Sequence, residues 1–241
     1  MRRFFGFAVA ALACLVLLPT VAHDETFGGV TYHLDGELVP VLTVDVSRTP
    51  VYFEHHILFW KHPTVAIRLK PMKGALKRMM AGMQIFVTEA TGNGMVAFSR
   101  DGPGHIVPLH MPHGTELQVR EHQFLAATES VDYTFERVRG AANLLFGGSG
   151  FFIDRFICQR GDGIVWLHGY GNVFEKVLAA GEMIDVEPSA WLYKDPSVRL
   201  ETRVDKLSSG LFGGMNFILN RFTGPGRLGL QSMYLHFPTS E

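Results

Sequence analysis

The chain has 241 residues, 47% of them hydrophobic, and its 22 Lys and Arg residues nearly balance its 23 Asp and Glu residues. A chain of this length can bury a core large enough to fold without disulfide or metal staples. The near-neutral charge argues against a nucleic-acid-binding protein, which needs a face that neutralises phosphates. Two cysteines are too few for a disulfide framework or a cysteine-rich metal site.

The first 22 residues are typical of an export signal. Two arginines precede an uninterrupted apolar run over residues 4–18, and a proline and small residues follow it before His23. We therefore predict that residues 1–22 are a signal peptide or an N-terminal membrane anchor, since about 20 apolar residues can also span a bilayer. A mitochondrial presequence is an alternative, although such segments are usually amphipathic and rich in Ser and Arg. A second alternative is that this segment forms a buried helix of the folded domain.

The predicted location follows from this segment. We expect an exported protein that is secreted, periplasmic or part of the cell envelope, with membrane anchoring through residues 4–22 as a variant and a mitochondrial location as the alternative. Cleavage after residue 22 would leave Cys158 as the only thiol. Its neighbours Phe156 and Ile157 are apolar, so we expect this cysteine to be buried.

Segments of the remaining chain resemble one another at intervals of 66 residues. The clearest match is Leu-Phe-Gly-Gly and its degenerate form Met-Met-Ala-Gly, at residues 79–82, 145–148 and 211–214. Lys61–Val65 also matches Lys194–Val198, and Gly104–Phe124 aligns with Gly171–Trp191. So many aligned positions indicate an internal repeat. We predict one β domain over residues 23–241, made of three repeats at approximately 30–98, 99–168 and 169–236.

Alternating patterns within the repeats predict strands. Val65, Ile67 and Leu69 alternate with Ala66, Arg68 and Lys70, and similar alternation begins at Val131 and Val198. Glycines at both ends of a three-residue segment predict tight hairpin turns at 92–94, 161–163 and 224–226. Helical turns are indicated only over Lys73–Met80, Gly140–Phe146 and Lys206–Phe212, each followed by glycine. One repeat cannot cover its own apolar strand faces, so we expect the copies to pack together in a β-sandwich or roll.

The glycine motifs, in their order along the chain, resemble a known family. The motifs are Phe146-Gly147-Gly148, Gly150-Phe151-Phe152, Phe212-Gly213-Gly214, Arg221–Gly226 and Leu230–Met233. They are similar to those of the mitochondrial-biogenesis proteins named for altered inheritance of mitochondria, and the likeness spans roughly residues 28–236. The resemblance implies a TRAP-like double-stranded β-helix, oligomers that include trimers, and no enzymatic activity. It also implies a link to inner-membrane organisation for the mitochondrial members.

The chain departs from this family pattern in two ways. An export signal precedes the domain, whereas many bacterial relatives look cytoplasmic, and this puts any location taken from the family in doubt. The first repeat has Met80-Ala81-Gly82 where the other two have Phe-Gly-Gly. We expect this second departure to affect stability more than function.

Histidines are the abundant residues with metal-binding chemistry. A metal site can be drawn with His105, His110 and His113, with Glu116 and His122 nearby. Ligands on one strand face are two residues apart, whereas the spacings here are five and three. The repeat alignment places Asn172, Val177 and Ala180 at the three corresponding positions. We therefore interpret these histidines as structural or exposed and predict no metal, cofactor or catalytic site.

A second histidine group contains His55, His56 and His62, beside Phe59 and Trp60. His56 aligns with His122, which indicates a structural position shared by two repeats. Arg155 and Arg221 also occupy equivalent positions, and we expect each to form an ion pair between repeats or to lie as a charge at a sheet edge. The glycine-rich segments lack the Gly-Lys-Ser/Thr of a phosphate loop, so we interpret them as turns.

The predicted function is a non-catalytic scaffold or envelope-organising protein that acts as an oligomer. Self-association, as a trimer among other forms, is the expected interaction. A membrane or membrane-protein partner is compatible with the apolar segments 144–146 and 211–212, which either touch a membrane or close the ends of the β core. No nucleic-acid partner is expected. The alternative is a cupin-like module that binds a ligand or a metal.

Overall fold

The computed structural model describes residues 24–72, 86–138, 151–208 and 214–233. In this part of the chain there are twenty strands and no helix, so the predicted all-β class is confirmed. None of the described residues therefore forms a helix with the length and hydropathy needed to cross a membrane. The predicted signal segment, residues 1–22, lies outside the described residues.

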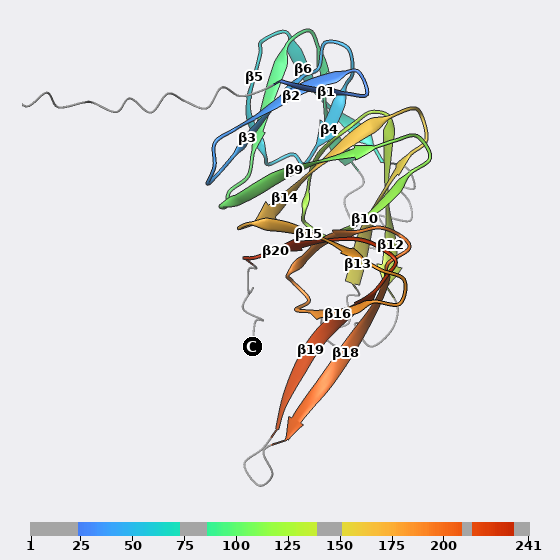
Figure 1. Ribbon diagram of the computed structural model, residues 1–241. Coiled ribbons are helices and arrows are strands. Elements are labelled where there is room, and N and C mark those ends of the chain that lie inside the picture. The colour runs from blue at the N-terminus through green and yellow to red at the C-terminus, as the bar shows by residue number, and fades with distance from the viewer. Residues whose placement is uncertain (1–23, 73–85, 139–150, 209–213, 234–241) are drawn as a thin grey trace, which may run out of the picture.

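The described strands form four antiparallel sheets (Figure 1). The order in sheet A is β1 (Glu25–Phe27), β2 (Val30–Asp35), β3 (Val41–Asp45), β8 (Met95–Ser99) and β5 (Leu58–Lys61). The order in sheet B is β6 (Val65–Pro71), β7 (Phe86–Gly92), β4 (Val51–Phe53), β11 (Phe124–Thr128), β14 (Gly163–Tyr170) and β9 (Gly104–Met111).

The other two sheets complete the stack. The order in sheet C is β12 (Val131–Val138), β13 (Phe151–Cys158), β10 (Glu116–Arg120), β17 (Trp191–Lys194), β20 (Gly226–Gln231) and β15 (Val173–Leu178). The order in sheet D is β16 (Met183–Val186), β19 (Gly214–Thr223) and β18 (Arg199–Ser208). Sheet D lies at the opposite end of the molecule from sheet A (Figure 1).

One pairing pattern recurs along the chain after the hairpin β1–β2. We call β3–β8 the first unit, β9–β14 the second and β15–β20 the third. In each unit the sixth strand pairs with the first and the third, and the fifth strand pairs with the second and the fourth. The second strand of one unit also pairs with the third strand of the next, as β4 does with β11 and β10 with β17. Sheets B and C therefore each combine three strands of one unit with three strands of the next.

The predicted hairpin turns are confirmed. The segments 92–94, 161–163 and 224–226 join β7 to β8, β13 to β14 and β19 to β20. Gly92, Gly161 and Gly226 have φ values of +128°, +104° and +137°, which L side chains rarely adopt. At Gly92 a Cβ would also lie 2.5 Å from the carbonyl oxygen of Thr64, so this backbone approach needs glycine.

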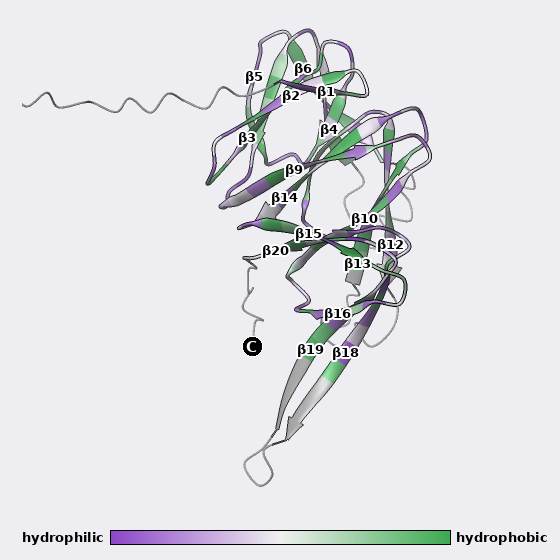
Figure 2. Ribbon diagram, in the orientation of Figure 1, coloured by the Kyte–Doolittle hydropathy of each residue, from purple (hydrophilic) through white to green (hydrophobic). Residues whose placement is uncertain are grey.

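Apolar side chains fill the spaces between the sheets. Phe53 and Phe98 meet between sheets A and B, with ring centroids 4.7 Å apart. Phe124 stacks on Phe156 at 5.0 Å between sheets B and C, and Trp191 packs against a phenylalanine of β19 between sheets C and D. Figure 2 shows hydrophobic residues along the strands and hydrophilic residues in many of the loops. The core is thus a series of filled layers.

Two details of the predicted elements are wrong. The helical turn expected over Lys206–Phe212 is extended at its start, because residues 206–208 continue β18 and pair with β19 as far as Gly214. The rest of that segment, residues 209–212, lies outside the described residues, as do Lys73–Met80 and Gly140–Phe146. Leu69, expected on the inner face of its strand, is 71% exposed, although Val65 at the start of the same strand is buried.

Candidate functional site

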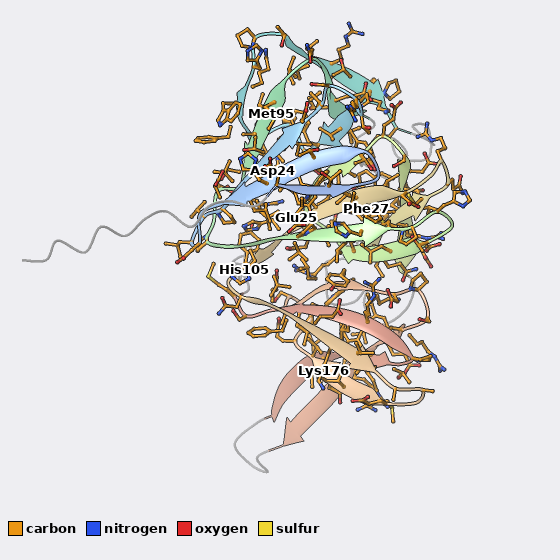
Figure 3. The ribbon with its side chains drawn as sticks, turned by 45° about the horizontal axis from the view of Figure 1, so that its top comes forward. Asp24, Glu25, Phe27, Met95, His105 and Lys176 are labelled. Atoms are coloured by element: carbon orange, nitrogen blue, oxygen red, sulfur yellow. The ribbon has the colours of Figure 1, made fainter. Side chains whose placement is uncertain are left out.

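The structure separates two of the histidines considered as a metal site. His110 and His105 both lie on β9, but their side chains contact different sheets. The His110 ring stacks on Phe27 of sheet A at 4.3 Å, whereas His105 Nδ1 accepts the backbone N–H of Val173 in sheet C at 3.4 Å. Residues five apart on a strand point to opposite faces, which explains the separation. Phe27 and His105 lie well apart in Figure 3.

The third member of that group, His113, lies in the turn after β9. Its backbone N–H donates a hydrogen bond to Asp162 Oδ1 at 2.9 Å. Within the described part of the chain, His105, His110 and His113 form no cluster of metal-ligand atoms. The His110 ring contacts those of Phe27 and Tyr32, but the residue is exposed, and the valine at its aligned position, Val177, is 69% exposed. The apolar environment inferred from that valine is therefore only partly present.

The connection between β4 and β5 brings a different set of ligand atoms together. Glu54, His55 and His56 each place one ligand atom within 4.8 Å of the others. The sequence had grouped the two histidines with His62, whose Nδ1 is instead hydrogen-bonded to Thr64 Oγ1 at 2.6 Å. A carboxylate beside two imidazoles is a donor set suited to zinc. Both histidines are exposed, however, and this set is a surface turn and not an enclosed cage.

Strand β5 has an exposed apolar surface. Leu58 is 37% exposed, Phe59 is 62% exposed and Trp60 is 44% exposed. The β5–β8 ladder has a register shift between Leu58 and Trp60, and β11 and β17 have the same irregularity against β14 and β20. This shared bulge aligns the three strands residue by residue. Exposed aromatic side chains at a sheet edge are unusual, because natural proteins blunt such edges with charges or cover them.

The counterparts of these residues in the other units are buried. They are Phe124, Leu125 and Ala126 in the second unit and Trp191, Leu192 and Tyr193 in the third. None of the six is more than 2% exposed. Full burial of an aromatic or aliphatic side chain is worth about 1.5–3 kcal/mol, so β5 leaves a large stabilisation unused. This strand is the strongest candidate for a binding surface.

The next position along these strands carries a lysine in two units. Lys61 ends β5 in an exposed position, and its counterpart Lys194 ends β17 with only 4% exposure. Lys194 Nζ donates a hydrogen bond to the carbonyl oxygen of Val198 at 2.6 Å. Burial lowers the pKa of Lys194 to about 8. The same position is therefore compatible with burial of a lysine when a neighbouring strand covers it.

Two equivalent arginines form ion pairs inside their own units. Arg155 of β13 donates Nε–H and Nη2–H to the two carboxylate oxygens of Glu116 on β10, and Arg221 of β19 donates likewise to Asp185 on β16. The expected ion pairs are present, but their placement between repeats is wrong. They join the second and fifth strands of one unit, because these strands are neighbours in the sheet.

A histidine and a cysteine are among the other buried groups with perturbed pKa values. His168 on β14 is 1% exposed, and burial, with a smaller effect from Arg100, lowers its pKa to about 4. Cys158 at the end of β13 is fully buried, as expected, and its Sγ donates to the carbonyl oxygen of Gly161 at 2.9 Å. Burial raises the pKa of this thiol, which makes it a poor nucleophile at neutral pH.

A stack of antiparallel sheets, with strands shared between successive units, defines the structural class. Comparison with known proteins gives the family. The family described as mitochondrial biogenesis AIM24 matches residues 32–233. The chain belongs to this family, which confirms the resemblance drawn from its glycine motifs. Those motifs at 145–148 and 211–213 lie outside the described residues, so their structural role is not part of this confirmation.

The fold also has a counterpart among solved structures. A crystal structure of a protein from Streptococcus pyogenes is similar with a TM-score of 0.62 and 20% sequence identity. The match covers 85% of this chain and 94% of the streptococcal chain. At this identity the similarity shows the fold alone. No curated protein matches the chain.

Proposed function

We propose that the protein is a non-catalytic scaffold that organises the cell envelope or a membrane by self-association. The observation that carries this proposal is the exposed apolar strand β5, whose counterparts in the other two units are buried. Contiguous exposed apolar side chains mark interaction sites, and an uncovered strand edge is a template for pairing with another chain. The primary partner is a second copy of the chain, with a membrane or membrane protein as the structure being organised.

The alternative, a cupin-like module for a ligand or a metal, needs an open polar interior that holds histidines. The layers between the sheets are filled by apolar clusters, and His105 and His110 lie on opposite faces of β9. These features favour the scaffold. Metal analysis of the purified protein tests the alternative directly, and a stoichiometric metal lost on His110→Ala would support it.

Two measurements test the scaffold proposal. Light scattering of the purified mature protein should give a mass of several chains, and a clean monomer at working concentration would contradict the proposal. Fractionation of cells, together with sequencing of the mature N-terminus, tests the location. We expect the envelope fraction and an N-terminus at His23, or an intact Met1 if residues 4–22 anchor the chain. A protein found only in the cytoplasm would exclude a role in the envelope.

A further inference from the structure

The sheets at the two ends of the molecule are halves of the sheets in the middle. Sheets B and C each contain six strands, three from one unit and three from the next. Sheet A contains three strands of the first unit, β3, β8 and β5, extended by the hairpin β1–β2. Sheet D contains only the three strands of the third unit, β16, β19 and β18. Sheet A therefore lacks a half made of second, fifth and fourth strands, which is the half that forms sheet D. Sheet D lacks the half that is present in sheet A.

The missing neighbours can be identified from the internal junctions. In the described residues, β5 pairs only with β8, whereas its counterparts β11 and β17 each pair on both sides. Likewise β16 pairs only with β19, whereas its counterparts β4 and β10 each pair on both sides. The neighbour missing from β5 is therefore the second strand of a preceding unit. The neighbour missing from β16 is the third strand of a following unit.

We infer that β16 of one molecule pairs with β5 of a second copy, antiparallel and in the register of the internal junctions. The combined sheet would have the order β18, β19, β16, then β5, β8 and β3 of the second copy. This is the order of sheets B and C written in strand equivalents. The inference rests on the proposed self-association and specifies its surface, its partner and its register.

The internal junctions fix the register. Phe53 lies opposite Ala126 between β4 and β11, and Val119 lies opposite Tyr193 between β10 and β17. Val186 is the counterpart of Val119, because Val119 and Val186 pair with Asp154 and Asn220 at equivalent places on the fifth strands. The equivalent contact between molecules therefore places Val186 opposite Trp60 of the second copy.

The adjacent position brings opposite charges together. Gln118 lies opposite Lys194 at the internal junction of sheet C, and the same register places Asp185 opposite Lys61 of the second copy. Asp185 already receives Arg221 from β19, but a carboxylate has further acceptor sites for an ammonium group. Directly opposite residues of unlike charge stabilise an antiparallel pair. The two free edges are thus complementary in charge as well as in strand type.

Pairing would bury the exposed side chains that distinguish β5 from its counterparts. Leu58, Phe59 and Trp60 would acquire the covered positions that the corresponding residues of β11 and β17 already occupy. The hairpin β1–β2 leaves this edge free, since it pairs with β3 at the far side of sheet A. The contact uses two different surfaces, so it extends head to tail and closes only as a ring of several copies.

Two proteins with one added cysteine each test the inference; both carry Cys14→Ser and keep the buried Cys158 as their only native thiol. One carries Trp60→Cys, which the Ala126 counterpart shows to be a site for a small residue, and the other carries Val186→Cys. At the internal junction, Glu54 N–H donates to Leu125 and Glu129 N–H donates to Pro50, at 3.1 and 3.0 Å. Phe53 and Ala126 lie between these bonds as a non-hydrogen-bonded pair, whose side chains are close enough for a disulfide.

Mild oxidation of the mixed proteins should give a covalent dimer that contains one copy of each. Either protein alone should give at least tenfold less, because each has only one half of the contact. Asp185→Cys in place of Val186→Cys is the out-of-register control, since its side chain points to the opposite face of the sheet. Equal cross-linking in either single protein or in the control would overturn the inference.

A charge variant gives an independent readout that needs no cysteine. Lys61→Glu places a carboxylate opposite Asp185 and should weaken self-association at least tenfold in light-scattering dilution series. Lys176→Glu on β15, labelled in Figure 3, makes the same charge change on an exposed residue outside both edges and should have little effect. Thermal melting of each variant checks that the fold is intact.

The outcomes separate this inference from the proposed function. An oligomer that neither cross-links between residues 60 and 186 nor responds to Lys61→Glu would overturn the inference and leave the scaffold proposal standing. A wild-type protein that stays monomeric in every preparation would overturn both. If a cysteine variant fails to fold, the Lys61→Glu and Lys176→Glu comparison decides the question.

Discussion

Arg155 holds Glu116 in a two-pronged contact, with Nε and Nη2 of the guanidinium each 2.7 Å from a carboxylate oxygen. These hydrogen bonds raise the pKa of Arg155. We expect Glu116→Gln to lower the free energy of unfolding by about 1 kcal/mol, because the pair has good geometry but is partly open to solvent. Urea unfolding checks this. Glu201→Gln is the matched control, since its contact with Arg199 is 3.9 Å and exposed, and an equal loss there would contradict the prediction.

Phe156 lies at the centre of the layer between sheets B and C. It is fully buried and stacks on Tyr133 and Phe124, with ring centroids 4.7 and 5.0 Å away. Phe156→Ala should lower the free energy of unfolding by about 3–5 kcal/mol through lost burial and the cavity left behind. Leu69→Ala, at a site that is 71% exposed, should change it by less than about 0.5 kcal/mol. Similar losses in the two variants, measured by urea unfolding, would show that this layer is not tightly packed.

His168 should make stability depend on pH. Burial lowers its pKa to about 4 in the folded protein against an ordinary value of 6.5, and the neighbouring ionisable groups of Arg100, Asp101 and His105 have smaller effects. Between pH 6.5 and 4 the unfolded chain binds more protons at this residue than the folded chain does. The free energy of unfolding should therefore fall as the pH drops through this window, by roughly 3 kcal/mol from this residue, and stay level in this contribution above it.

Urea unfolding at a series of pH values checks the assignment to His168. His168→Gln should remove most of the slope between pH 6.5 and 4. His122→Gln, at an exposed residue, should leave the slope as it is in the wild type. A slope that survives His168→Gln would have to come from other groups, and the prediction would be wrong.

Removal of residues 190–241 should unfold the whole domain. The deletion takes β17 and β20 from the middle of sheet C and β18 and β19 from sheet D. It exposes the apolar residues that packed against these strands between sheets B and C. We expect an insoluble protein or a broad, non-cooperative melt. A soluble truncated chain with a sharp thermal transition would show that the first two units fold by themselves.

Local features of the fold could be predicted from the sequence because short-range geometry produces them. Glycines at 92–94, 161–163 and 224–226 permit the hairpins, and alternation marks the strands that flank them. Phe86, Phe152 and Ile218, aligned by sequence, lie opposite Pro71, Arg137 and Val204, which are equivalent ladder positions. The reading of the sequence as three copies of one ancestral piece stays an interpretation. The structure adds the recurrence of the pairing pattern.

The sharing of strands between units could not be predicted in the same way. The pairing of β4 with β11 joins residues more than 70 positions apart, and neither strand carries a local signal for its partner. For the same reason the apolar stretch Leu58-Phe59-Trp60 is typical of a buried strand, although it lies at an open edge. The spacing of five between His105 and His110 did predict their separation. Glu54 directly precedes His55 and His56 but was missed as their companion, because the convergence of the three ligand atoms depends on the local turn.

The sharing of strands also governs how such a protein can change in length. Insertion or loss of one unit would alter the number of complete layers, yet the chain would still end in two half-sheets, each with an unpaired edge strand. Shortening the molecule cannot remove them, and neither can lengthening it. Only an additional capping segment or pairing between two molecules can cover these edge strands. The hairpin β1–β2 covers β3, which lies on the opposite side of β8 from β5.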